Sequence, residues 1–225
     1  MNRIFLLSPA HCGGRRAKQA LSPNARFALA EQLRSPDGAQ LGDVFAFVSG
    51  LYFRGKLAYA RRFAAVADPG NPVVGGGVHV ITPTAGLRSP DTTVTASALR
   101  AFADGDVHQD NAAYRVPLEW SAGALAREIG GESDVVLLGS IASPKYVDVL
   151  LAIFGDRLVF PVDFVGRGDM SRGGLLLRKV AEGCELAYAP VAGAVLHGAR
   201  PPKLPPLRKI SGLQGGRIAG REGGT

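Results

Sequence analysis

Cysteines, long apolar runs and metal-binding motifs are scarce in this sequence. Only two cysteines are present, Cys12 and Cys184, which is too few for a disulfide framework. No apolar run reaches the roughly 18 residues that a membrane-spanning helix needs, and the apolar stretch after Met1 is too short for a signal peptide. CxxC and HxxxH spacings are also absent, so we expect no metal site. These absences predict a cytoplasmic protein with reduced thiols and no membrane association.

Apolar residues make up 46% of the 225-residue chain and charged residues 20%, which is enough for one α/β domain with a sizeable core. The net charge of +7 is unevenly distributed. Residues 197–225 contain six basic residues and one acid, whereas residues 1–196 contain 20 basic and 18 acidic residues. The basic segment is rich in proline and glycine, so we expect a flexible tail beyond about Leu207. Such a tail either binds nucleic-acid phosphates or only keeps the chain soluble.

Apolar runs and helical spacings alternate along residues 1–196. We expect strands at residues 4–7, 43–48, 78–81, 134–138, 158–160 and 186–191. We expect helices at residues 23–33, 55–67, 95–103 and 121–129, and two more that begin at Pro144 and near Ser171, with residues 104–120 irregular. This order predicts a single Rossmann-like domain over residues 1–196: a mainly parallel open sheet with helices on both faces.

A glycine-rich turn follows the fifth expected strand and precedes the last expected helix. It contains Gly166, Arg167, Gly168, Asp169, Ser171 and Arg172. Glycines allow close approach to a ligand, a helix N-terminus favours an anion, and arginine binds phosphate through two donors. Serine stands where the third glycine of a dinucleotide fingerprint belongs, and no GK[ST] element follows. The turn therefore predicts a phosphate-binding loop without implying a cofactor.

Other candidate ligand-binding residues follow the remaining strands, at the edge where parallel sheets bind ligands. Small, hydroxyl-bearing and cationic side chains of this kind are typical of a nucleotide crevice. We expect Tyr52 to stack on a base. The candidates are Ser8, Gly13, Gly14 and Arg15 after the first strand, Tyr52 and Arg54 after the second, and Gly139, Ser140 and Lys145 after the fourth.

Two carboxylates in or beside the glycine-rich turn are the candidate catalytic residues. Asp169 lies between two arginines, Arg167 and Arg172, so we expect it to stay ionised. It is either a general base or the cap of the following helix. Asp163 has the same two interpretations.

The N-terminal part of the chain resembles YaaA-type and related uncharacterised α/β proteins. The resemblance covers residues 4–91 and rests on three short motifs: Ser8-Pro9-Ala10, Leu51-Tyr52-Phe53-Arg54-Gly55, and Ala85-Gly86-Leu87-Arg88-Ser89-Pro90-Asp91. Arg15-Arg16 stands where this family has a lysine pair. The resemblance implies nucleic-acid binding or nucleobase-related chemistry in the cytoplasm. It identifies no catalytic residue.

Three functional hypotheses follow from these patterns. The first is an intracellular protein that binds a nucleotide or a nucleic-acid phosphate at the sheet edge, with or without an enzymatic activity on a nucleobase or glycosidic bond. The second is a non-catalytic nucleic-acid-binding protein in which the basic tail provides most of the affinity. The third is a transferase or hydrolase of a small phosphorylated or carboxylated metabolite. The sequence does not determine the oligomeric state.

Overall fold

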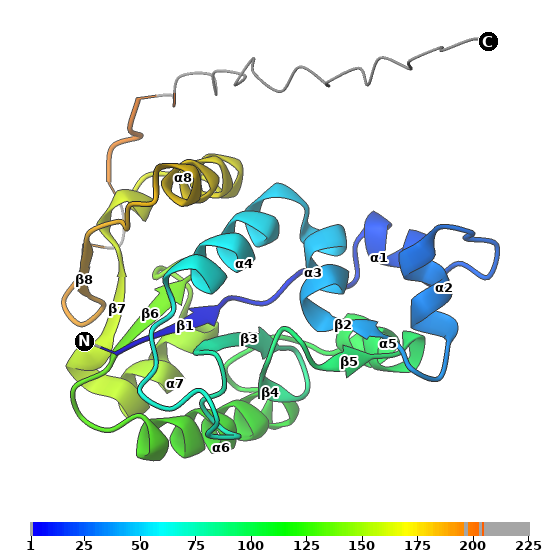
Figure 1. Cartoon of the computed structure of the whole chain (residues 1–225), viewed down its shortest axis with the longest axis horizontal. Helices are drawn as coiled ribbons and strands as arrows, with labels where there is room; N and C mark the ends of the chain where they lie inside the picture. The colour runs from blue at the N-terminus through cyan, green and yellow to red at the C-terminus, as the bar shows by residue number, and fades with distance from the viewer. Residues whose placement is uncertain (1, 196–197, 203, 205–225) are drawn as a thin grey trace, which may run out of the picture.

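A computed structural model of the chain describes residues 2–195, 198–202 and 204 (Figure 1). The predicted flexible tail beyond Leu207 lies outside the described residues. Within the described residues, no helix combines the length and the apolar character that crossing a membrane requires.

A six-stranded sheet forms the centre of the molecule, with strand order β4-β3-β1-β6-β7-β8. The four inner strands run parallel, and the two edge strands, β4 and β8, are antiparallel to their neighbours. The strands span Arg3–Leu7 (β1), Val78–Thr82 (β3), Gly86–Arg88 (β4), Asp134–Leu138 (β6), Leu158–Pro161 (β7) and Tyr188–Pro190 (β8). A separate pair joins β2 (Ala39–Gln40) to β5 (Thr93–Val94). The prediction of a mainly parallel open sheet is confirmed.

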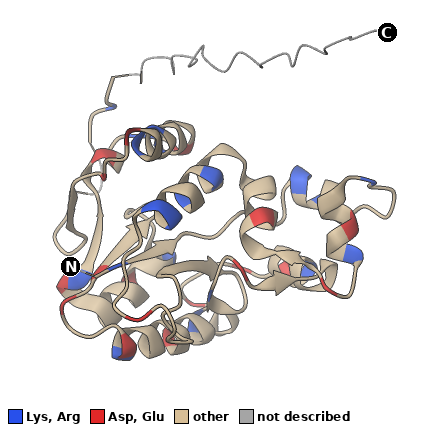
Figure 2. Ribbon diagram, viewed as in Figure 1, with Lys and Arg blue, Asp and Glu red and all other residues tan. Residues whose placement is uncertain are grey.

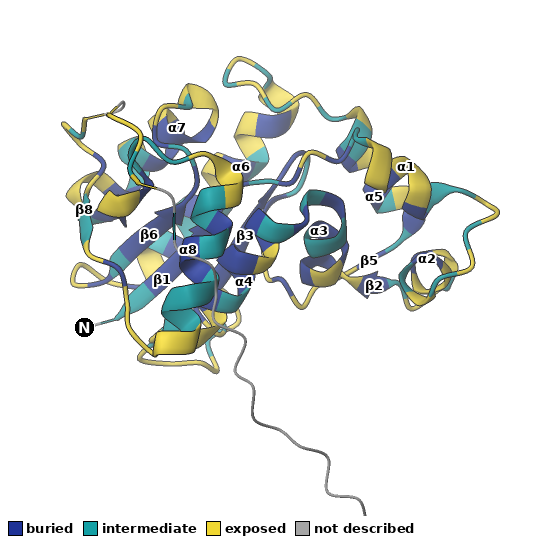
Figure 3. Cartoon of the chain, turned by 90° about the horizontal axis from the view of Figure 1, so that it is seen from above, coloured by how far each residue is buried: buried dark blue, intermediate teal, exposed yellow. Residues whose placement is uncertain are grey.

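Helices cover both faces of the sheet, as the sequence predicted (Figures 1 and 3). Alternate side chains of β1 explain this arrangement: Phe5 and Leu7 enter one apolar core, and Ile4 and Leu6 enter the other. The first core is covered by α1 (Arg15–Leu21), α2 (Ala28–Arg34), α3 (Leu41–Ser49), α4 (Leu51–Phe63), α5 (Ala96–Asp104) and α8 (Asp169–Glu182). The second is covered by α6 (Ala112–Glu128) and α7 (Pro144–Phe154).

Residues 43–48, predicted to be a strand, belong to helix α3. The apolar run has the spacing of a helix. Leu41, Val44, Phe45 and Val48 lie on its buried face, and Asp43 is exposed. Packing of this apolar face therefore outweighed the strand preference of valine and phenylalanine. As a result, Tyr52 and Arg54 lie on α4 and do not follow a strand.

Residues 104–120, predicted to be irregular, contain the first half of α6. The Asn111 side chain accepts a hydrogen bond from the Ala113 backbone N–H and caps this helix. Pro117 lies inside the helix, where it lacks the N–H of one helical hydrogen bond. The glycine–arginine segment after β1 is also partly helical, since α1 begins at Arg15.

Helices α4 and α8 cross at a pair of glycines. A Cβ atom at Gly55 would lie 2.7 Å from the Gly173 carbonyl oxygen, and one at Gly173 would lie 2.8 Å from the Tyr52 Cα. Both distances are too short for a side chain, and the opposing atoms belong to the backbone. The two helix backbones are therefore in direct contact, which holds the start of α8 against the first turns of α4.

Substituting Gly173 tests this crossing, and Gly174 provides the matched control. We expect Gly173→Ala to lower the free energy of unfolding by about 1–3 kcal/mol, because the added methyl group forces the helices apart. A Cβ atom at Gly174 would meet only Leu204 Cδ1, at 3.8 Å. Gly174→Ala should therefore be neutral or stabilise by up to about 1 kcal/mol. Urea unfolding measures both variants, and equal destabilisation of the two would contradict the crossing.

Candidate functional site

Between strands β1 and β6 the order in which the chain adds strands to the sheet reverses direction. From β1 the chain moves to β3 on one side, and it later returns to β6 on the other. Open α/β sheets bind ligands at the carboxyl ends of such strand pairs. Ser8 follows β1 here, and Gly139 and Ser140 follow β6. A Cβ atom at Gly139 would lie 2.9 Å from both Ser8 Cβ and Tyr146 Oη, so only glycine fits between them.

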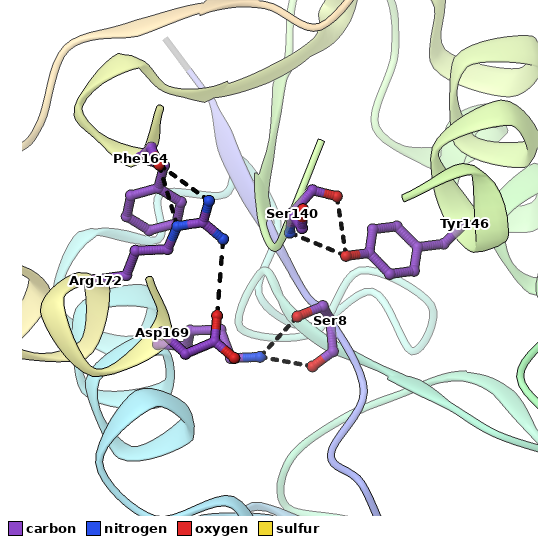
Figure 4. Close-up of polar contacts among 7 residues, drawn as sticks. Ser8, Ser140, Tyr146, Phe164, Asp169 and Arg172 are labelled. Atoms are coloured by element: carbon purple, nitrogen blue, oxygen red, sulfur yellow. Dashed lines mark hydrogen bonds and ion pairs between the residues drawn. The ribbon is translucent and has the colours of Figure 1, made fainter. Parts of the chain in front are cut away.

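A buried lysine, Lys56 on α4, lies beneath Ser8. Its side chain is 2% exposed, and its Nζ donates to the Ser8 carbonyl oxygen at 2.7 Å and contacts Ser8 Oγ at 2.9 Å. Both contacts are drawn at Ser8 in Figure 4. The same Nζ lies 4.6 Å from the centre of the Tyr52 ring and 4.9 Å from that of Phe53. The amine thus joins the end of β1 to α4 inside the apolar core.

Burial governs the charge of Lys56. Removal from water lowers the pKa of its amine to about 7, while the Asp169 carboxylate raises this pKa and the Arg172 cation lowers it further. Near neutral pH, a substantial share of the amine is therefore unprotonated. An unprotonated lysine can accept a proton or act as a nucleophile.

Arg172 and Asp169 meet at the start of α8, beside this lysine (Figure 4). Arg172 donates to the Phe164 carbonyl oxygen from Nε at 3.2 Å and from Nη2 at 3.0 Å, and its Nη1 lies 3.8 Å from Asp169 Oδ1. Its side chain is only 13% exposed, whereas that of Asp169 is 72% exposed. Arg172 therefore holds the turn before α8 in place, and its two bonded nitrogens are not directed at a ligand.

Tyr52 lies inside this group of residues. It is 9% exposed, and its ring packs edge-on against Phe164 with 6.4 Å between the ring centres. Burial raises the pKa of its hydroxyl, and the nearby Arg172 cation opposes this effect. In this position the ring supports Lys56, and stacking on a base would require it to leave the core.

One pocket of about 410 Å³ opens beside Ser8, and we call it the Ser8 pocket. It brings together three of the predicted ligand-binding residues: Ser8, Gly13 and Lys145. Tyr146 Oη forms part of its wall and is held by the backbone of Ser140, whose N–H donates to it at 3.0 Å. The other lining residues are Pro9, Ala10, His11, Cys12, Pro83, Phe102, Ala103, Gly105, Asp106 and Val107.

A second pocket of about 410 Å³ lies at the start of α8, and we call it the arginine pocket. It contains predicted residues of the glycine-rich turn together with Arg178 of α8 and Arg200 of the basic C-terminal segment. None of the described residues that line it is acidic. The lining residues are Arg167, Gly168, Met170, Ser171, Gly174, Arg178, Arg200, Pro201, Pro202 and Leu204. Figure 2 shows basic residues on the neighbouring ribbons of α8 and α4.

Two residues of the glycine-rich turn shape this pocket. Arg167 is held by the Asp163 carbonyl oxygen, 3.0 Å from Nε, and by Ser171 Oγ, 3.3 Å from Nη1. Gly166 has a φ of 72°, and a Cβ atom there would collide with the Ala199 carbonyl oxygen. The turn can therefore take this shape, with the C-terminal segment lying against it, only because residue 166 is glycine.

The remaining predicted site residues lie apart from both pockets or at their margins. Gly14 precedes α1 as its N-cap, and Arg15 is exposed in the first turn of that helix. Arg54 is exposed on α4. Asp163 is exposed, and its charge acts on Lys179, whereas that of Asp169 acts on Lys56. The structure therefore brings some of the predicted residues into two separate pockets and leaves the others outside both.

The sequence interpretation did not select Lys56, although a signal for it was present. Tyr52 and Lys56 are four residues apart and therefore share one face of α4. The shared face of Tyr52 and Lys56 does not follow from the predicted helix, because that helix begins at residue 55, after Tyr52. Burial, which makes the lysine chemically unusual, depends on packing that one sequence does not reveal.

Scans of protein-family models, curated proteins and solved structures found no match to this chain. The resemblance to YaaA-type proteins stays a hypothesis based on its three motifs. The functional argument therefore rests on the geometry of the two pockets.

The lowered pKa of Lys56 predicts how stability depends on pH. Below pH 7 the amine is protonated in both folded and unfolded chains, so the cost of burying a cation is fully present. Between about pH 7 and its ordinary pKa of 10.5, only the unfolded chain holds the proton, so stability rises with pH. The free energy of unfolding of the wild type, relative to Lys56→Met, should rise by up to about 1.4 kcal/mol per pH unit over this range.

Urea unfolding at several pH values measures this difference. Lys18→Met removes an exposed lysine of α1 and is the matched control for the loss of a lysine side chain. A difference between the wild type and Lys56→Met that stays constant with pH would show that the buried amine does not titrate in this range.

Proposed function

We propose that the protein binds phosphate groups of a nucleotide or nucleic acid at the arginine pocket. The main support for this proposal is that Arg167, Arg178 and Arg200 line one pocket and that none of its described lining residues is acidic. Guanidinium groups form strong, paired hydrogen bonds with phosphate oxygens. Three arginines around one pocket supply positive charge that suits a phosphate group.

Two further features support this proposal. The 14-residue helix α8 begins at the pocket, and its first backbone N–H groups and its dipole favour an anion there. Arg200 belongs to the basic C-terminal segment, whose charge suits a polyanion longer than one nucleotide. The core of the protein thus contributes a defined phosphate site, and the segment after it contributes additional positive charge.

For chemistry on a nucleobase or glycosidic bond, Asp169 is a better candidate than Asp163. Its exposed carboxylate begins α8 and interacts electrostatically with Lys56 and Arg172, whereas Asp163 interacts with Lys179. A carboxylate so placed can activate water or stabilise positive charge on a sugar.

The Asp169→Asn variant tests this role with nucleosides and nucleotides as substrates and chromatography of the products. It should bind these compounds normally, and its turnover should be at least about 100-fold lower than that of the wild type. Unchanged turnover would remove Asp169 from the mechanism.

Fluorescence anisotropy tests the phosphate site. Short labelled single-stranded DNA and RNA should bind the full chain, and Arg167→Gln or Arg200→Gln should each weaken binding roughly tenfold. Each variant should also reduce the slope of log affinity against log salt by about one, because one phosphate contact is lost. Arg127→Gln, on the exposed face of α6, is the matched control and should bind like the wild type.

A second set of variants separates the pocket from the C-terminal charge. Replacing Arg208, Lys209, Arg217 and Arg221 with glutamine retains the chain length and the pocket residues. If this variant still binds mononucleotides in a thermal-shift assay, binding resides in the pocket. If it loses all binding while Arg167→Gln loses none, the protein is a nucleic-acid binder driven by its basic C-terminal segment, and the pocket proposal fails.

A further inference from the structure

We propose that Ser8 and Lys56 form a catalytic pair for acyl transfer, in which Ser8 Oγ is the nucleophile and Lys56 Nζ is its general base. This inference concerns the Ser8 pocket and goes beyond phosphate binding at the arginine pocket. Nothing in it depends on a nucleotide. The expected substrate is a small ester or thioester.

The hydrogen bonds around Lys56 suit this role. A neutral amine has two N–H donors and one lone pair. Lys56 Nζ can donate one N–H to the Ser8 carbonyl oxygen, 2.7 Å away, and accept the hydroxyl proton of Ser8 Oγ, 2.9 Å away. With one N–H on the carbonyl oxygen, the lone pair of the neutral amine can accept from the hydroxyl of the same residue. Nucleophile and base thus lie within hydrogen-bond reach of each other, as general-base activation of serine requires.

The surroundings favour a neutral base and an accessible nucleophile. Lys56 is buried against the rings of Tyr52 and Phe53, and burial brings the pKa of its amine close to neutral pH. A base with such a pKa can both take up and return a proton at physiological pH. Ser8 is 7% exposed and lines the Ser8 pocket, so a substrate reaches it from the pocket while the lysine stays behind it.

The proposed reaction proceeds in two steps and needs no oxidant or reductant. Ser8 Oγ forms a bond to the acyl carbon, the carbonyl π electrons move to oxygen, and the hydroxyl proton passes to Lys56. Collapse of this intermediate expels the alcohol or thiol, which takes the proton from the Lys56 ammonium and leaves an acyl ester on Ser8. Water attacks that ester with Lys56 again as the base. Collapse of the second intermediate breaks the bond between Ser8 Oγ and the acyl carbon, and the Lys56 ammonium returns its proton to Ser8 Oγ. The net reaction consumes one water and releases a carboxylic acid together with the alcohol or thiol.

The pocket lining indicates which acyl compounds fit. Pro9, Ala10, Phe102 and Ala103 offer an apolar wall to a short acyl chain. His11, Lys145 and Asp106 are exposed polar residues of the same lining, with one cation and one carboxylate among them, and would meet a polar leaving group at the mouth. We therefore expect a short acyl group carried by a polar alcohol or thiol.

Covalent labelling of the full chain tests the pair directly. A fluorophosphonate reacts with an activated serine, forming an Oγ–phosphorus bond and releasing fluoride. Intact mass should show one added phosphonyl group per chain, and peptide mapping should assign it to Ser8. Ser8→Ala should remove the label, whereas Ser143→Ala, the nearby control, should retain it. Absence of a label, or a label elsewhere, would overturn the proposal.

The base is tested by the rate of labelling. Lys56→Met should slow it by at least about 100-fold, while Lys18→Met should leave it unchanged. The wild-type rate should rise about tenfold per pH unit below pH 7 and level off above it. If Lys56→Met is labelled as fast as the wild type, the proposed pair is wrong. If that variant does not fold, a labelling rate of the wild-type protein that does not change with pH would overturn the pair instead. Ser8→Ala should still bind DNA at the arginine pocket, so the two proposals can fail separately.

Discussion

Direct backbone contact between α4 and α8 at Gly55 and Gly173 is the constraint that places the start of α8, and with it the arginine pocket, beside the buried Lys56. Because no side chain separates the helices there, the first turn of α8 lies against Tyr52 and Lys56. The charges of Asp169 and Arg172 in that turn act on the buried amine. Arg167 and Ser171, at the same end of α8, line the arginine pocket. A larger residue at the crossing would disturb both sites.

The buried amine of Lys56 costs folding free energy that a methionine of similar length would not. Its direct hydrogen-bond partners are the carbonyl and hydroxyl oxygens of Ser8, both uncharged, and Asp169 acts on it only through its charge. Buried cations are usually neutralised by a close ion pair or lose their proton. Lys56 belongs to the second kind, and such a residue at the carboxyl edge of a parallel sheet is typical of a reactive group.

The sheet could be predicted from the sequence, and the composition of the pockets could be predicted only in part. Strands β1, β6 and β7 are short, largely apolar runs, so local pattern suffices to find them. Helix α3 was mistaken for a strand because its apolar face is as continuous as that of a buried strand. Ser8 and Gly139 were selected because the parallel sheet fixes where strand ends meet. Lys56 and Arg200 join their pockets through contacts between distant segments, which no local pattern encodes.

The contact between Gly166 and Ala199 closes the arginine pocket with a segment that is distant in the sequence from the start of α8. The C-terminal segment folds back over the turn at Gly166, and Arg200 then forms one wall of the pocket. The eight strands of the described residues all precede this segment, so the sheet is complete without it. A chain that ended before Ala199 would keep its sheet and lack that wall of the pocket.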